Sequence, residues 1–258
     1  TPLYSSAASD VYKRQVYGDL FTAPEETQRA MDSITELGLA YTKYGVAVSD
    51  SLNVAADAAA AGFQGVDLQN QTTASLKLSV LGQMELQKAL ETTIALQNAF
   101  RISSEELVGT IDFLNAVENQ TVVSLDDITE ATPRVATVIQ ALGGDVKDLA
   151  FFLAAMKEGG VNAAQGANAL KSGLASLINP TERASDMLLG MGVNIRAIVS
   201  ENQGDLKGTI VEFAQALDTL DPMNRARAIE QLFGKFQFAR MSALFDNVIR
   251  DGSQASRV

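Results

Sequence analysis

Three pairs of adjacent acidic residues are the strongest candidates for acid–base chemistry in this 258-residue sequence. They are Glu25–Glu26, Glu105–Glu106 and Asp126–Asp127. Two carboxyl groups facing each other across a cleft, about 5 to 9.5 Å apart, could hydrolyse a glycosidic bond. Neighbouring residues on a helix point about 100° apart, however, and each pair lies near an expected helix start, where acids complement the helix dipole. We therefore expect these pairs to stabilise helices.

Few other residues in the sequence could support catalysis. The absence of Cys and His excludes thiolate nucleophiles, imidazole bases and the common zinc and iron–sulfur sites. Gly190 and Gly192 lack the third glycine and the preceding strand of a nucleotide-binding loop. Arg225, Arg227 and Arg240 could bind an anion, but the surplus acids are their expected partners. We expect no catalytic, cofactor-binding or metal-binding residues, and no cofactor.

The charge balance is acidic. Lys and Arg number 20 against 31 Asp and Glu, which gives a net charge of -11 and a pI near 4.5. Such a surface opposes polyphosphate binding, so no specific nucleic-acid binding is expected. The longest apolar run, Leu149 to Met156, is far shorter than the ~20 residues of a membrane-spanning helix. No membrane segment is therefore expected in this chain.

The two ends differ from the rest of the sequence. Residues 1–15, TPLYSSAASDVYKRQ, show no helical or strand period and resemble a translated sequencing adapter. Residues 251–258, DGSQASRV, contain no obvious terminating element. We expect a non-native leader over 1–15, one helical domain over 16–250 and a truncated tail over 251–258. The sequence is then an internal fragment of a longer protein.

Helical periodicity dominates the domain. Apolar residues recur at helical spacing from Leu206 to Leu220 and again from Ile229 to Phe245. Start signals precede such segments. In Asn179-Pro180-Thr181-Glu182 we expect Asn179 as the N-cap and Pro180 in the first helical position, and Asp221-Pro222 repeats the pattern; Ser103 with Glu106 and Asn162 with Gln165 have the spacing of a capping box. Gly143-Gly144 and Gly159-Gly160 suit left-handed helix ends, and Gln120 to Leu125 is the only short strand candidate.

These signals predict an all-α fold, an irregular array of short amphipathic helices and helical hairpins broken by glycine turns. A weak two-fold internal repeat also emerges at an offset of 98 residues, which places Gly45 on Gly143, Asp50 on Asp148 and Gly62 on Gly160. The two repeat units would cover about 40–100 and 138–200. Chance alignment of Ala- and Gly-rich hairpins explains the matches equally well, because helical periodicity alone generates such coincidences.

Four phenylalanines near the end of the domain span more than one helical face. They are Phe233, Phe236, Phe238 and Phe245. We expect most of them in the core and at least one ring packed against another element or another chain.

A family resemblance is carried by motifs from Phe151 to Asn247. A glycine turn at Glu158 to Val161 is followed by an Ala/Leu-rich helix and a lone proline step at Asn179-Pro180-Thr181. Then come the Leu-Leu-Gly turn that starts at Leu188 and the Phe233-Gly234 pair after a short helix. In this order and spacing the motifs resemble the core domain of phage tail tape measure proteins. The segments at Ala58 to Gln64, Ser124 to Ala131 and Leu142 to Leu149 extend the resemblance over most of Val16 to Asn247.

The resemblance implies a structural protein of a bacteriophage or prophage tail, and not an enzyme. The parent polypeptide would set tail length during assembly and occupy the tail lumen of the virion until DNA ejection, after assembly in the bacterial cytoplasm. Its implied partners are the tail tube protein, tail assembly chaperones, baseplate or tail-tip proteins, and further copies of itself in the lumen. Because this chain is broken into short helices, we expect a folded domain beside the ruler. A helical protein-interaction module and a carboxylate-dependent peptidoglycan-cleaving domain are the alternatives.

Overall fold

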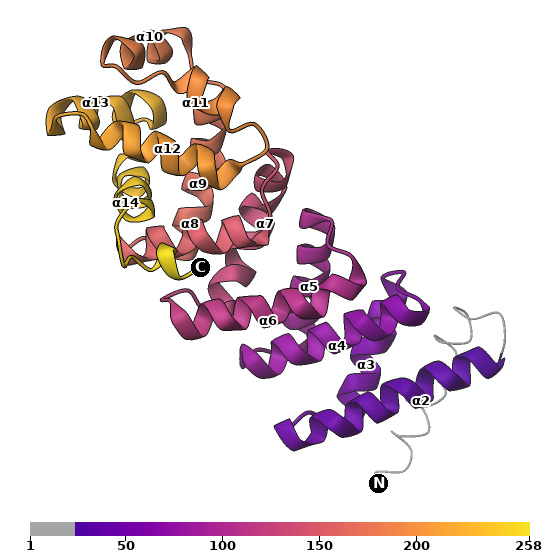
Figure 1. Cartoon of the computed structure of the whole chain (residues 1–258). Helices are drawn as coiled ribbons and strands as arrows, with labels where there is room; N and C mark the ends of the chain where they lie inside the picture. The colour runs from indigo at the N-terminus through magenta and orange to yellow at the C-terminus, as the bar shows by residue number, and fades with distance from the viewer. Residues whose placement is uncertain (1–23) are drawn as a thin grey trace. The chain divides into compact units, whose positions relative to one another are not determined.

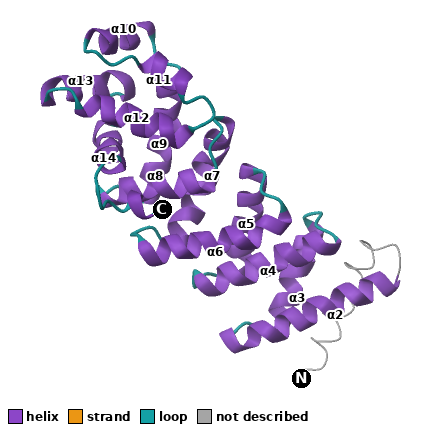
Figure 2. Ribbon diagram, in the orientation of Figure 1, coloured by secondary structure: helices purple, strands orange, loops and turns teal. Residues whose placement is uncertain are grey.

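The computed structural model describes residues 24–258, and their side chains from Arg29 onward. The expected leader at 1–15 lies outside the described residues. The described part contains α-helices and two short 3-10 turns but no strand, as Figure 2 shows, so the predicted all-α class is confirmed. The strand candidate at Gln120 to Leu125 forms the end of one helix, a turn and the start of the next.

The chain divides into two compact units, residues 1–113 and 114–258, and the division falls within α6. Each unit is described by itself. The helices of the first unit are α2 (Pro24–Tyr41), α3 (Val48–Ala60), α4 (Gly65–Leu81), α5 (Leu86–Phe100) and the first part of α6 (Ser104–Gln120). A 3-10 turn, η1 (Thr42–Tyr44), joins α2 to α3 (Figure 1).

The second unit holds the end of α6 and eight further helices. They are α7 (Leu125–Ala141), α8 (Val146–Glu158), α9 (Ala163–Ile178), α10 (Glu182–Gly190), α11 (Ile195–Glu201), α12 (Leu206–Asp218), α13 (Pro222–Phe233) and α14 (Phe238–Val248), followed by the 3-10 turn η2 (Ala255–Arg257). No described helix is both long enough and apolar enough to cross a membrane.

The core of the first unit forms around the alanine-rich helix α3. Val54 and Ala58 pack with Ile34 of α2, Leu68 of α4 and Leu90 of α5 in one buried cluster. Small side chains on α3 allow its neighbours to approach closely, which raises the packing density. Burial of these apolar surfaces contributes on the order of 25 cal/mol per Å² to folding.

A buried polar network also joins α4 to α5. Gln71 Nε2 donates to Thr93 Oγ1 over 2.8 Å, and the hydroxyls of Ser75 and Thr93 lie 2.9 Å apart. All three side chains are fully buried. Because an unpaired polar group is costly in this position, these hydrogen bonds favour one register of the two helices, although Gln71 Oε1 is buried without a hydrogen-bond partner among the described residues.

The core of the second unit forms around α8. Every residue from Leu149 to Met156 is buried. The longest apolar run of the sequence therefore lies within α8, the central helix of this unit. α7 and α9 pack against each other and against α8. On the other side α14 lies across α8, and Asn247 Nδ2 donates to the carbonyl of Ala155 over 2.9 Å.

The phenylalanine cluster divides between core and surface. The ring centroids of Phe233 and Phe245 lie 5.5 Å apart, and Phe245 lies 5.3 Å from Phe213 in an edge-to-face arrangement. Phe233 and Phe245, two of the four phenylalanines singled out in the sequence, are buried, as is Phe213, whereas Phe238 is half-buried. Phe236 is 94% exposed in the turn between α13 and α14.

Helix starts follow the sequence signals in part. Asn162 accepts a hydrogen bond from Gln165 N over 2.9 Å at the start of α9, which is one of the two bonds of a capping box. Asp221 caps α13 with Pro222 in the first turn, and the Ser103–Glu106 capping box precedes α6. The predicted N-cap Asn179 is wrong: α10 is capped by Thr181, whose hydroxyl accepts a hydrogen bond from Ala184 N over 3.2 Å. The threonine hydroxyl reaches the third helical amide, whereas Pro180 and Asn179 remain in the connection.

Glycines end several helices in the left-handed region. Gly143 has φ +86° after α7 and Gly160 has φ +79° after α8. A side chain at Gly143 would also lie 3.2 Å from the Cα of Gly204 in the turn before α12. Glycine is therefore needed at position 143 both for its backbone conformation and for this close approach.

The last residues of the chain pack onto α8. Ser253 and Ala255 are buried, and Glu158 accepts hydrogen bonds from Arg250 and from the backbone N–H of Gln254. Residues 251–258, which the sequence suggested as a tail, thus contribute to the second unit. The division at 16–250 and the two-fold repeat remain predictions.

Candidate functional site

The paired acidic residues lie at helix starts. Glu105 and Glu106 occupy the first turn of α6, and Asp126 and Asp127 occupy the first turn of α7. Glu25–Glu26 falls in the first turn of α2, but its side chains lie outside the described residues. The positions agree with stabilisation of the helix dipole.

Glu106 and Asp127 are engaged in capping boxes. Hydrogen bonds from the hydroxyl and backbone N–H of Ser103 lower the pKa of Glu106 below its ordinary value. Asp127 has the same relation to Ser124, and it also forms an ion pair with Lys157 of α8. Burial raises the pKa of Asp127, but the hydrogen bonds from Lys157 and Ser124 lower this pKa by a larger amount. The net shift is therefore downward. These carboxylates are poor proton donors at neutral pH.

The three arginines make separate contacts and do not converge on one anion site. Arg225 pairs with Asp246 of α14 at 2.5 Å, and Arg240 donates to the Gln237 side chain at 3.0 Å. Arg227 is exposed on α13. The ion pair of Arg225 matches the expected partnership with surplus acids.

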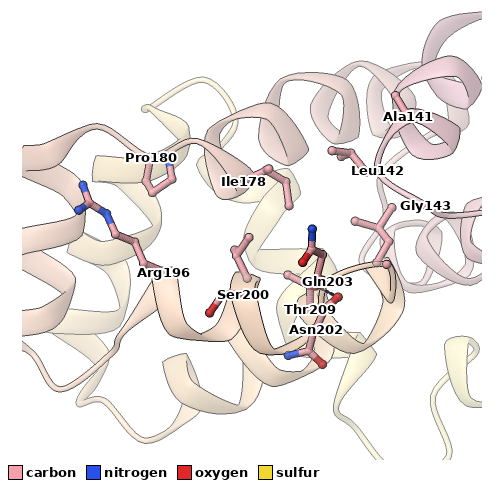
Figure 3. Close-up of a pocket in the computed structure, with 13 residues that line it drawn as sticks. Ala141, Leu142, Gly143, Ile178, Pro180, Arg196, Ser200, Asn202, Gln203 and Thr209 are labelled. Carbon is pink, nitrogen blue, oxygen red and sulfur yellow. Dashed lines mark hydrogen bonds between the residues drawn. The ribbon is translucent and has the colours of Figure 1, made fainter.

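The second unit contains a cleft of about 600 Å³ that the sequence did not reveal. Figure 3 shows Pro180 and Arg196 at one end and Gly143 at the other. The lining comes from the ends of α7 and α9, from α11 and from the start of α12: Ala141, Leu142, Gly143, Ile178, Pro180, Arg196, Val199, Ser200, Asn202, Gln203, Gly204, Leu206 and Thr209. It is predominantly apolar, with a few polar groups, as small binding sites commonly are.

Local hydrogen bonds hold the polar wall of this cleft. Asn202 Nδ2 donates to Glu212 at 2.5 Å and to the carbonyl of Ile198 at 2.9 Å. The Ser200 hydroxyl donates to the carbonyl of Ala197 over 3.0 Å, and the Thr209 hydroxyl donates to the carbonyl of Asp205, the N-cap of α12, over 2.9 Å. The sequence gave no signal for the cleft because its lining is brought together from four separate segments.

The cleft lacks the groups required for acid–base catalysis. No Asp or Glu is among its lining residues, and none lines a second cleft of about 700 Å³ between α2 and α4. A glycosidase needs two carboxyl groups in such a position. Among the described residues no group of three or more acidic side chains is arranged to hold a metal ion.

A comparison with known protein families shows to which family the chain belongs. The profile of the family described as phage-related minor tail protein matches residues 25–234, which is most of the chain. This chain belongs to the phage-related minor tail protein family. The match covers α2 to α13, so it includes the described helices of the first unit, most of the second unit and the cleft, but not α14.

Relatives of this tail protein carry a more specific name. The tape measure protein of Pneumococcus phage Dp-1 is 22% identical over 222 residues, which cover 86% of this chain and 19% of that protein. The probable tape measure protein of Escherichia phage P2 is 22% identical over 173 residues, 65% of this chain and 21% of that protein. The chain spans about a fifth of the length of these curated relatives. No solved structure matches it.

These findings support the resemblance to tape measure proteins and give the chain a structural role in a phage tail. Its place is the tail of the virion, among other tail proteins.

Proposed function

We propose that this chain is a folded domain of a tape measure protein that sets tail length and occupies the tail lumen until DNA ejection. The match of the tail protein family over residues 25–234 carries the proposal, and the two relatives named as tape measure proteins support it. The whole parent would meet the tail tube protein, assembly chaperones and baseplate or tail-tip proteins, and would be present in several copies.

The fold suggests how the work is divided within the parent. Ruler function needs axial length, and a helix supplies about 1.5 Å per residue. The longest described helix, α2, has 18 residues, which amounts to about 27 Å before the chain turns back. Turns and antiparallel packing reduce the axial length that the remaining helices of the chain can span. We therefore assign the measuring role to other parts of the parent and a docking role to this domain.

A tail-length experiment tests the assignment. In a phage that encodes this chain, deletions within a long helical part of the parent should shorten the tail by about 1.5 Å per residue in electron micrographs. Disrupting this domain through Phe213→Ala should reduce the number of complete tails and leave the length of the remaining tails unchanged. Proportional shortening after changes within residues 24–258 would contradict the division of roles.

A protection experiment tests the lumenal position. An epitope inserted at the exposed Gly252 should resist protease in intact tails and become accessible after ejection is triggered. The matched control is the same epitope on an outer tail protein, which should be cleaved in both states. Cleavage at Gly252 in intact virions would place the domain outside the tube.

A further inference from the structure

The turn between α13 and α14 displays an aromatic side chain to solvent. Phe236 is 94% exposed, the largest exposed fraction among the large apolar side chains of the described residues, whereas Phe233 three positions earlier is buried. A phenyl ring that stays in water forgoes the stabilisation that its burial would supply. Contact with a partner that covers Phe236 is therefore favourable.

Hydrogen bonds fix the backbone of this turn. Gly234 N donates to the carbonyl of Glu230 over 2.8 Å, and Gln237 N donates to the carbonyl of Gly234 over 3.2 Å. Arg240 Nη1 donates to the Gln237 side chain over 3.0 Å and to the carbonyl of Phe236 over 3.5 Å. The phenyl ring is thus held out on a preformed turn, which lowers the entropy cost of inserting it into a partner.

The cleft at the ends of α7 and α9 has room for such a side chain. Its volume is about 600 Å³, and Ile178, Val199 and Leu206 supply apolar lining. An apolar cavity of about 150 Å³ is enough to bind benzene. No residue of the turn 234–237 lines the cleft, and Figure 1 shows α13 and α14 to the left of α9 and α7 to its right. The phenyl ring of one molecule therefore lies outside its own cleft.

The charges beside the phenyl ring and beside the cleft are complementary. Lys235, which precedes the ring, is 86% exposed. Glu201 and Asp205 are also exposed, and each lies between two lining residues of the cleft in the chain. Arg196, the cation of the lining, is confined to one end of the cleft, as Figure 3 shows. A pair between Lys235 and these acids of another copy offsets part of the repulsion between chains of net charge -11.

We propose that Phe236 of one molecule inserts into this cleft of a second copy, with Lys235 facing Glu201 and Asp205 of that copy. The phenyl ring and the cleft are different surfaces of the same unit, so the contact is head-to-tail and further copies add in the same way. The inference rests on the proposed function for the presence of several copies in one tail, and it names the contact between them.

Self-association of the full chain tests the contact. Sedimentation velocity at increasing concentration should show masses that rise beyond that of a dimer. Phe236→Ser should raise the dissociation constant roughly 10- to 150-fold, the range expected for burial of one phenylalanine side chain. Met223→Ser, at an exposed apolar residue outside both surfaces, is the matched control and should leave association unchanged. A chain that stays monomeric at every concentration would overturn the contact, whereas the tail-length and protection experiments would be unaffected.

A mixing experiment shows whether the phenyl ring enters the cleft. Ser200→Trp and Gln203→Trp each place a large side chain at an exposed lining residue, and circular dichroism should show unchanged helicity for both. Either variant alone, like Phe236→Ser alone, should be monomeric where the unchanged chain associates. An equimolar mixture of Phe236→Ser with a tryptophan variant should form a dimer and stop there, because one molecule supplies the cleft and the other the phenyl ring. A mixture that stays monomeric, or tryptophan variants that associate as the unchanged chain does, would refute insertion.

Discussion

Gly159 provides the sharpest test of the packing between α8 and α14. It ends α8 with φ -80°, a conformation that alanine adopts without strain. A Cβ added there would lie 2.4 Å from the Cβ of Ala243 and 3.3 Å from its Cα. Gly159→Ala therefore isolates a steric effect between the two helices.

The expected cost follows from that distance. Overpacking of a well-packed contact costs about 1–3 kcal/mol. Separation of the helices also strains the hydrogen bond from Asn247 to Ala155, worth about 1 kcal/mol. We expect a total of about 2–4 kcal/mol, which corresponds to a roughly 30- to 900-fold increase in local opening of α14.

Hydrogen exchange measured by mass spectrometry is the suitable assay, because it reports α14 separately from the first unit. Gly190→Ala is the matched control, since nothing lies within 4 Å of its added Cβ, and it should leave exchange unchanged or slow it. Ala243→Gly in the Gly159→Ala background should restore most of the protection, less about 1 kcal/mol for glycine in a helix. Unchanged exchange in Gly159→Ala, or no rescue by Ala243→Gly, would refute the contact.

Three further predictions concern stability. Phe213→Ala should lower the free energy of unfolding by about 3–5 kcal/mol, because the fully buried ring packs on Phe245. Thermal denaturation followed by circular dichroism should show a lower midpoint for this variant. The lowered pKa of Asp127 contributes stability that is present above its unfolded pKa and lost as pH falls through its folded pKa, so Lys157→Met should flatten the acid side of urea denaturation measured against pH. Burial raises the pKa of Asp148, so its ionised form destabilises the fold above that pKa; Asp148→Asn should raise the urea midpoint at pH 7, and the gain should vanish at acid pH.

Local signals in the sequence predicted much of the fold. Asp221 with Pro222 and Ser103 with Glu106 mark helix starts because their hydrogen bonds span only three residues. The missed cap at Thr181 shows the limit of such reasoning, since two polar residues flank one proline and only the three-dimensional course of the chain selects between them.

The long-range features could not be predicted in this way. The cleft joins residues from Ala141 to Thr209, and no local pattern records which turns come together. The close approach of Gly143 to Gly204 could not be predicted from the sequence either. The turn that contains each glycine is already a sufficient reason for a glycine there. The exposure of Phe236 also depends on tertiary packing, since Phe233, three residues earlier, is buried and Phe238, two residues later, is half-buried.

The contact between Asn247 and Ala155 has a consequence for synthesis on the ribosome, because its partners are 92 residues apart in the chain. At about 5–20 residues per second, roughly 5–20 s pass between the synthesis of α8 and that of α14, which covers one side of it. During that interval Phe151 and its apolar neighbours lack their cover, whereas all the helices that pack around α3 have already been translated. The nascent second unit is thus exposed to aggregation for a defined time, and slowing translation after α8 should lower the soluble yield.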